Sequence, residues 1–142
     1  MGERKMTVIV CLDDRGGMTF NRRRQSQDRR VRERMVQMAQ NGCLRMNAYS
    51  AGQFEEEYRP GLYVEEDFLE KGEPKDFCFA ENCTLAPYEG KIERLIVFRW
   101  NRVYPNDRKL DLSLEGETWK VTETEEFAGF SHEKITMEVY TK

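Results

Sequence analysis

The chain has 142 residues, of which 39% are hydrophobic and 35% are charged. This length suits one domain with its own core and is too short for two, so we predict a single domain over residues 1–142. Acidic residues outnumber basic ones, 26 to 23, which argues against general nucleic-acid binding. No stretch approaches the ~20 apolar residues of a membrane span, and no signal-peptide pattern is visible, so we expect a cytoplasmic protein without membrane contact.

Charge is distributed unevenly along the chain. Residues 21–34 hold seven arginines against Asp28 and Glu33, a local charge of +5, whereas residues 55–76 hold nine acids against three bases, a local charge of −6. Such runs are most often solvated faces. These two could also pair within the chain, pair between the chains of a homodimer, or steer an anionic ligand.

The first predicted elements are a buried strand, a glycine loop and an amphipathic helix. Residues 6–12 (MTVIVCL) form a continuous apolar run, typical of a strand covered on both faces. Gly16 and Gly17 end that strand in a loop. Ser26 is the expected N-cap of the helix, and Gly42 its stop. The apolar face of this helix is formed by Val31, Met35, Met38 and Ala39.

The remaining elements alternate in type and then become strands alone. A short helix capped by Ser50 is expected to reach Tyr58, and a helical turn is expected around residues 66–69. The expected strands cover residues 43–47, 76–81, 94–100, 109–114, 118–124 and 134–141. Because the last three alternate in polarity and are short, they indicate antiparallel pairing. The order predicts an α/β fold: a mixed, mostly parallel central sheet with flanking helices and a C-terminal antiparallel hairpin.

One family resembles this pattern. A first strand ending in Asp, followed by Gly17, Met18, Asn21 and a helix with Asp28 at its start, resembles dihydrofolate reductase. The closing segment, with Ser131-His132 before a final strand, is similar to the terminal hairpin of that family. The resemblance implies that Gly17, Met18 and Asn21 form a mobile loop over a ligand. It also implies that Asp28 is the catalytic acid, which holds a pterin-like ring.

The cofactor motifs of that family are largely missing. Residues 22–25 (RRRQ) replace the Pro-Trp that closes the mobile loop, and residues 47–50 (NAYS) stand where a Gly-Arg-x-Thr would bind cofactor phosphates. Glu81 lies where a Gly-Gly turn would approach the dinucleotide, and its carboxylate would repel a pyrophosphate. Ser50 remains the candidate residue for binding the phosphate end of a cofactor. The cofactor is therefore unknown, and NADPH is disfavoured.

Three positions have both a structural and a ligand-binding interpretation. Asp28 could bind a ligand or relay a proton, or could pair with a nearby arginine, Arg24 or Arg32. Arginines 22–24 are placed to hold a phosphate or carboxylate bidentately, although three in a row cannot all point one way, and Arg24 is our candidate. Asn101 and Arg102 could line a pocket at the carboxyl edge of the sheet, or form a structural turn.

No metal site is predicted, because His132 is the only histidine and histidine-based zinc sites need more. Three hypotheses for function follow. The first is a small-molecule binder, for a nucleotide-like or anionic ligand, without classical reductase activity. The second is an NADPH-dependent reductase of a pterin-like or other small substrate. The third is a self-associating protein, in which the basic helix start meets the acidic middle of a second copy.

Overall fold

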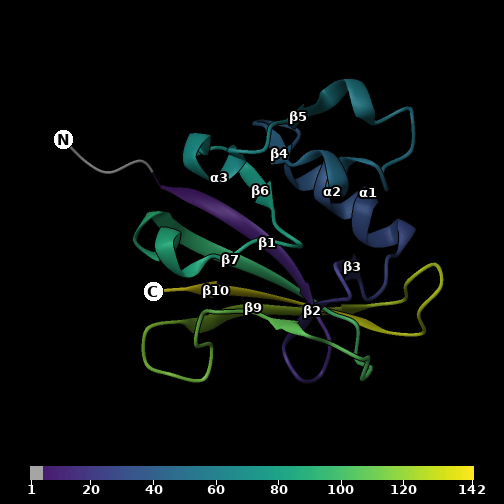
Figure 1. Ribbon diagram of the computed structural model, residues 1–142, viewed down its shortest axis with the longest axis vertical. Helices are drawn as coiled ribbons and strands as arrows, with labels where there is room; N and C mark the ends of the chain where they lie inside the picture. The colour runs from purple at the N-terminus through teal and green to yellow at the C-terminus, as the bar shows by residue number, and fades with distance from the viewer. Residues whose placement is uncertain (1–4) are drawn as a thin grey trace.

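The structure is a computed structural model that describes residues 5–142, and a seven-stranded sheet organises it (Figure 1). In spatial order the strands are β5 (Leu62–Val64), β4 (Leu44–Met46), β6 (Phe77–Phe79), β1 (Met6–Leu12), β7 (Ile92–Arg99), β10 (Ile135–Thr141) and β9 (Lys120–Phe127). Neighbours from β5 to β7 run parallel, and β10 is antiparallel to both β7 and β9. The predicted mixed, mostly parallel sheet with a C-terminal antiparallel hairpin is confirmed.

Strand β1 lies at the centre of the sheet and is buried on both faces. Val8 pairs with Cys78 of β6 and with Leu95 of β7. Val8 and Val10 belong to the hydrophobic core on one face, whereas Ile9 belongs to the core on the other. This two-sided burial explains why the strand reads as a continuous apolar run instead of an alternating one.

The helices are shorter than expected, and two caps differ from the prediction. Helix α1 (Arg29–Met38) packs Val31 and Met35 against the Ile9 face of the sheet. Its N-cap is Asp28, whose Oδ1 accepts a hydrogen bond from the backbone N–H of Arg30, so the assignment of Ser26 as the cap is wrong. The two other helices are α2 (Ala48–Ala51) and α3 (Phe68–Lys71), and the 3-10 helices cover Arg59–Gly61 and Ala86–Lys91.

Asn47 caps α2 in place of Ser50. The Asn47 Oδ1 atom accepts from the backbone N–H of Ser50 at 3.0 Å, which puts Ser50 inside the helix and buries it completely. Asparagine is at least as good an N-cap as serine, and it comes earlier in the chain. The helix then ends at Ala51, with Gly52 as its C-cap, well before the expected end at Tyr58.

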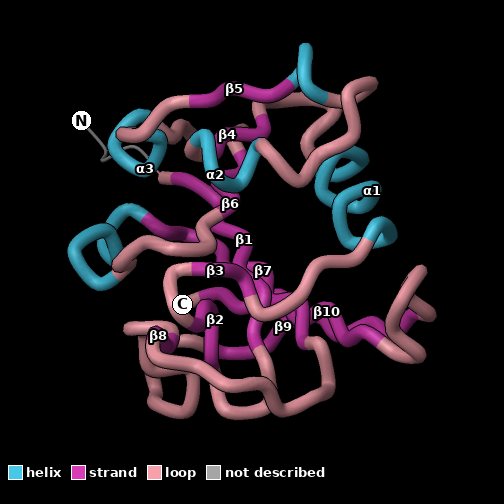
Figure 2. The backbone as a smooth tube through the Cα atoms, turned by 45° about the vertical axis from the view of Figure 1, so that its right-hand side comes forward, coloured by secondary structure: helices cyan, strands magenta, loops and turns pink. Residues whose placement is uncertain are grey.

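A second, three-stranded sheet was not expected from the sequence (Figure 2). Its order is β3 (Arg23–Arg24), β2 (Gly17–Phe20) and β8 (Arg108–Lys109), all antiparallel. Asp13 folds this segment back: its buried carboxylate accepts from the backbone N–H groups of Arg15, Gly17 and Tyr104 and from the Gln25 amide, at 2.8–3.1 Å. The strand expected over residues 109–114 is therefore limited to β8, which joins this sheet instead of the central one.

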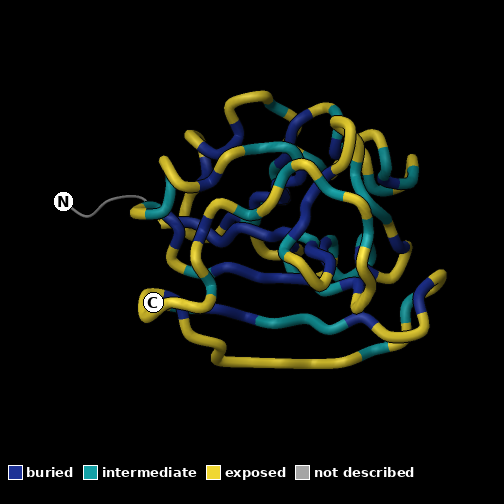
Figure 3. Tube along the Cα trace, turned by 60° about the horizontal axis from the view of Figure 1, so that its bottom comes forward, coloured by how far each residue is buried: buried dark blue, intermediate teal, exposed yellow. Residues whose placement is uncertain are grey.

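Exposure is concentrated at the periphery (Figure 3). The edge strand β9 exposes every residue from Lys120 to Glu126. Its charged side chains blunt an edge that would otherwise offer unpaired backbone groups to another chain. No helix within residues 5–142 has the length and apolar character needed to cross a membrane.

Candidate functional site

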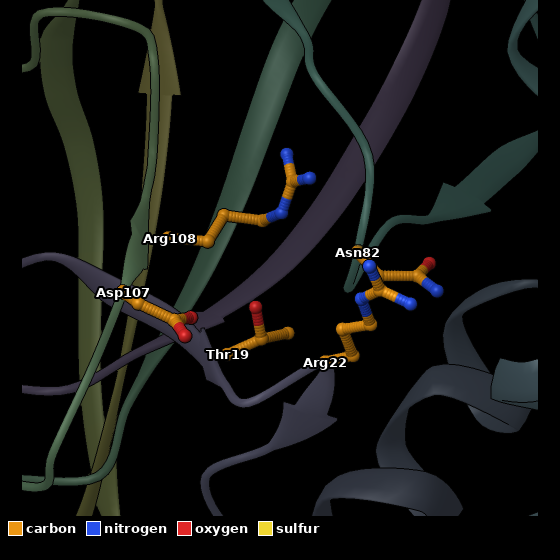
Figure 4. Close-up of a pocket in the computed structure, with 5 residues that line it drawn as sticks. All are labelled: Thr19, Arg22, Asn82, Asp107 and Arg108. Atoms are coloured by element: carbon orange, nitrogen blue, oxygen red, sulfur yellow. The ribbon is translucent and has the colours of Figure 1, made fainter.

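A cleft of about 590 Å³ lies between the small sheet and the segment that follows β6. Figure 4 shows Asp107 and Arg108 on one side, Arg22 and Asn82 on the other, and Thr19 between them. Thr19 belongs to β2, and its carbonyl accepts from the backbone N–H of Asp107 at 3.1 Å. Asn82 comes just after β6. The cleft therefore opens beside the carboxyl ends of β1 and β6, the edge at which open α/β sheets bind ligands.

Two arginines give this cleft its electrostatic character. Within the described part of the chain, neither Arg22 nor Arg108 forms an ion pair or side-chain hydrogen bond. Arg22 stands at the turn between β2 and β3 with a φ of 66°, and its neighbour Asn21 has a φ of 54°. Asp107 fixes this turn, because its Oδ2 accepts from the backbone N–H of Asn21 at 3.0 Å. The arrangement leaves two guanidinium groups free to bind an anion.

Arg24, the arginine favoured by the sequence, is not free. Its Nε lies 2.9 Å from Glu81 Oε2, and its Nη2 lies 3.1 Å from Glu81 Oε1. The same carboxylate accepts from Ser50 Oγ at 2.8 Å and from the Gln53 amide at 3.0 Å. The structure thus brings the predicted residues Arg24 and Ser50 together, around a carboxylate. The hydroxyl expected at the phosphate end of a cofactor site donates to the protein's own Glu81.

Asp28 lies at the start of α1, and its carboxylate has no exposed surface. Besides capping α1, it accepts from the backbone N–H groups of Phe130 and Ser131, each at 2.9 Å. Ser131 Oγ and His132 Nδ1 complete the set, at 3.2 and 2.8 Å. Burial raises the pKa of Asp28, but these hydrogen bonds outweigh it and lower the pKa from 3.8 to about 2.

The loop over Asp28 requires a glycine at position 129. A Cβ atom there would lie 2.7 Å from Asp28 Oδ2 and 2.9 Å from the carbonyl oxygen of His132. The expected ion pair of Asp28 with Arg24 or Arg32 is wrong, because Arg24 binds Glu81 and Arg32 binds Glu55 at 2.7 Å. Asp28 is therefore bonded to backbone groups, a serine and a histidine.

The other predicted site residues are dispersed. Gly17 pairs with Lys109 in the small sheet, and Met18 is buried in the core. Asn21 lines a second cleft of about 430 Å³, next to the first. Asn101 donates its amide to the Lys134 carbonyl and to Thr136 Oγ1, and Arg102 is exposed. Neither Asn101 nor Arg102 lines either of these clefts.

Sequence reasoning missed most of the residues that line the first cleft. Arg22 was one of three adjacent candidates, but Thr19, Asn82, Asp107 and Arg108 were not singled out. The available signal was the Asp107-Arg108 pair directly after a proline turn. Nothing local in the sequence shows that β8 returns to β2. Within residues 5–142, no group of three or more His, Cys, Asp or Glu side chains could hold a metal ion.

Comparison with known proteins bears on the fold. The fold is that of dihydrofolate reductase, an α/β fold whose mixed sheet ends in an antiparallel C-terminal hairpin. Among the solved structures that match is dihydrofolate reductase from Enterococcus faecalis complexed with NADP(H) and RAB-propyl. It has a TM-score of 0.67 over 96% of this chain and 95% of that one, at 10% sequence identity. No protein-family model and no curated protein matches the sequence.

Proposed function

We propose that this dihydrofolate-reductase-like protein binds a small phosphorylated, nucleotide-like ligand in the cleft between Arg22 and Arg108, without classical reductase activity. One observation carries the proposal: two guanidinium groups that have no hydrogen-bond or ion-pair partner within residues 5–142 line the same cleft. A guanidinium donates two parallel hydrogen bonds to a phosphate, and this charge-assisted pair is among the strongest polar contacts in proteins. The other arginines beside the small sheet and α1 mostly bind acids of the same chain.

The remaining lining residues suggest what else the ligand carries. Asp107 contributes a carboxylate that accepts from a backbone N–H and has further lone pairs available. It would repel a ligand that is anionic throughout, but it would accept from a hydroxyl or amino group. The Thr19 hydroxyl and the Asn82 amide add neutral polar groups. A phosphate joined to a sugar or base fits this combination better than a free inorganic anion.

The reductase is the alternative, and one contact argues against it. The related structure was solved with NADP(H), which makes a nicotinamide nucleotide a reasonable ligand to test. In this chain, however, Ser50 donates to Glu81, and a carboxylate there opposes a cofactor phosphate. We therefore favour binding of a nucleotide outside the Ser50 position over hydride transfer from NADPH.

The test is isothermal titration of the purified protein with inorganic pyrophosphate, ADP and NADPH. We expect ADP to bind, and Arg22→Ser or Arg108→Ser to weaken ADP binding by roughly tenfold or more, because each removes a charge-assisted hydrogen bond. Arg23→Ser is the matched control: it removes the same charge from the next residue along the chain, but Arg23 lines the second cleft. Its ADP affinity should stay near that of the unmodified protein.

Two results would overturn the proposal. One is the absence of binding for ADP and pyrophosphate, and the other is an equal loss of ADP affinity in Arg23→Ser and Arg22→Ser. Tight binding of NADPH, with its oxidation when dihydrofolate is added, would instead establish the reductase. Pyrophosphate binding as tightly as ADP would contradict the role given to Asp107 and leave a simple anion site.

A further inference from the structure

Three side chains from two segments, the start of α1 and the loop before β10, form a continuous hydrogen-bonded chain outside the cleft described above. Ser26 Oγ lies 2.8 Å from His132 Nε2, and His132 Nδ1 lies 2.8 Å from Asp28 Oδ2. Ser26 is half-buried, whereas His132 and Asp28 are buried. The chain therefore runs from an ionised acid in the interior, through an imidazole, to the hydroxyl of a half-buried serine.

The donors and acceptors around Asp28 determine the tautomer of the histidine. Because Asp28 is ionised, it only accepts hydrogen bonds, so the proton between Asp28 and the neutral imidazole lies on Nδ1. The Nε2 atom then has a lone pair and accepts from the Ser26 hydroxyl. This is the protonation pattern in which a histidine removes a proton from a serine nucleophile.

The imidazole is also held rigidly. Trp100 stacks on it, with ring centroids 4.7 Å apart and an angle of 23° between the planes. Asp28 is fixed in turn by the backbone N–H groups of Arg30, Phe130 and Ser131. A general base needs such support, because its efficiency depends on geometry that is set before the substrate arrives.

The Ser26 hydroxyl is not needed to build the helix. Asp28 provides the N-cap of α1, and the backbone of the loop 129–132 is tied to Asp28 instead of Ser26. Ser26 is thus an addition to a network that is already complete. This separates the hydroxyl from the structural role of the acid and the imidazole.

We propose that Ser26 is a nucleophile for acyl transfer from small activated esters, with His132 as the general base and Asp28 as the positioning residue. The Ser26 oxygen forms a bond to the ester carbonyl carbon while its proton moves to His132 Nε2. The bond to the leaving oxygen then breaks, and Nε2 returns the proton to that oxygen, giving an alcohol and an acyl-serine. Water then attacks the acyl-serine by the same route, which releases the carboxylic acid and restores the hydroxyl.

The surroundings leave room for a small substrate. Gln25, the neighbour of Ser26, and Tyr104 line the cleft of about 430 Å³. The Tyr104 hydroxyl lies 3.5 Å from the same Nε2 atom and can donate to a carbonyl or leaving oxygen beside it. Phe20, whose side chain is half-exposed, adds an apolar wall. An ester with a compact acyl group fits this position.

The experiment is labelling with a fluorophosphonate probe, with the modified residue identified by mass spectrometry. We expect Ser26 to react roughly a hundredfold faster than Ser113, because a positioned base typically contributes a factor of about 10² to 10⁴. Ser113 is exposed on another segment and serves as the internal control. This comparison is made within one folded molecule, so it does not depend on the folding of any variant.

Further measurements distinguish a nucleophile from a structural hydroxyl. Ser26→Ala should abolish both labelling at this position and hydrolysis of p-nitrophenyl acetate, and His132→Gln should reduce both. The labelling rate of the unmodified protein should rise with pH through the deprotonation of a single group, which a purely structural role would not produce. Labelling of Ser26 at the rate of Ser113, or ester hydrolysis unchanged in Ser26→Ala, would overturn the proposal.

Discussion

The Asp28 carboxylate accepts five hydrogen bonds without any exposed surface, so this one side chain joins two distant parts of the chain. It holds the first turn of α1 through Arg30, and the loop before β10 through Phe130, Ser131 and His132. Buried carboxylates are tolerated when donors replace the lost water. The sequence marked this residue as a ligand-binding acid, a role that stays a prediction. Any such role would require its present partners to move, or would act through His132.

Replacing Asp28 by asparagine should therefore be costly. In Asp28→Asn the carboxamide has one acceptor oxygen, and its NH₂ group faces some of the N–H groups that now donate to the carboxylate. We expect a loss of about 3 kcal/mol in the free energy of unfolding, since each buried unsatisfied group costs about 1–3 kcal/mol. Urea unfolding followed by circular dichroism measures this loss.

Asp67→Asn is the control for that substitution. Asp67 is half-exposed, and within the described residues its side chain makes one ion pair, at 3.6 Å with Lys71, which is also half-exposed. Surface pairs of this kind contribute little, so we expect a change within about 0.5 kcal/mol. If the two variants lost similar stability, the Asp28 network would not be the anchor described above.

At the scale of elements, the sequence predicted the strands and helices whose burial is visible as a local pattern of apolar residues. Strand β1 and helix α1 were found because a continuous apolar run and a helical stripe are visible within a few residues. The small sheet was missed because Gly17 pairs with Lys109, far along the chain, and no local pattern encodes that contact. The helix caps were misplaced for another reason: adjacent Ser, Asn and Asp residues are all good caps, and tertiary contacts select among them.

The residues of the candidate site were predicted or missed for the same reason, namely whether a local pattern in the sequence shows them. The loop that carries Arg22 was found, because a glycine break followed by three arginines is visible locally. Asn82, which lies beside Arg22, and Arg108 on the opposite side were not found, because the segment after β6 and strand β8 bring them to the cleft from distant positions. The ion-pair partner of Arg24 could not be predicted either, because the pairing of β6 with β1 is what brings Glu81 close to Arg24.

Gly42 gives a test at the junction of two elements. It follows α1, and a Cβ atom there would lie 1.9 Å from the carbonyl oxygen of Lys75, which is backbone and cannot easily move. We expect Gly42→Ala to lower the free energy of unfolding by about 2–4 kcal/mol, at the upper end of single substitutions, because α1 and the segment before β6 would be forced apart. Denaturant midpoints report the effect.

Gly90→Ala is the matched control, since, its chain neighbours apart, no atom of the described residues lies within 4 Å of the position that its Cβ would take. We expect it to be neutral or slightly stabilising, because alanine reduces the entropy of the unfolded chain. A mild effect at Gly42, equal to that at Gly90, would contradict the close approach to Lys75.

For the whole molecule, the opposite charge runs meet within the chain. Arg32 of the basic run binds Glu55 of the acidic run at 2.7 Å, and Arg34 binds Glu125 of β9 at 2.7 Å. Arg45, from β4, binds Asp76 at 2.6 Å. The Arg32–Glu55 pair thus joins the two runs, and the Arg34–Glu125 pair joins α1 to the edge strand. Because these charges already pair within one chain, fewer of them are available to pair with a second copy. Self-association through the two runs stays a prediction.

This arrangement predicts that acid unfolds the protein through its carboxylates. The pKa of Asp28 is lowered to about 2; burial raises the pKa of Asp13, but four hydrogen bonds outweigh it and lower that pKa, and the pKa of Glu55 is lowered chiefly by its hydrogen bond with Arg32. A group with a lowered folded-state pKa stabilises above its unfolded-state pKa, and this stabilisation is lost as pH falls through the folded value. For Asp28 that interval runs from about pH 4 to about pH 2, and its contribution is about 2 kcal/mol.

Urea unfolding at a series of pH values checks this expectation. The free energy of unfolding should fall steeply below about pH 4, since protonation of Asp28 breaks the network that joins α1 to the loop before β10. Asp28→Asn should be less stable at neutral pH yet show a shallower decline below about pH 4, because the group that titrates there is gone. A decline as steep in Asp28→Asn as in the unmodified protein would assign the acid sensitivity to the other carboxylates, Asp13 and Glu55 foremost.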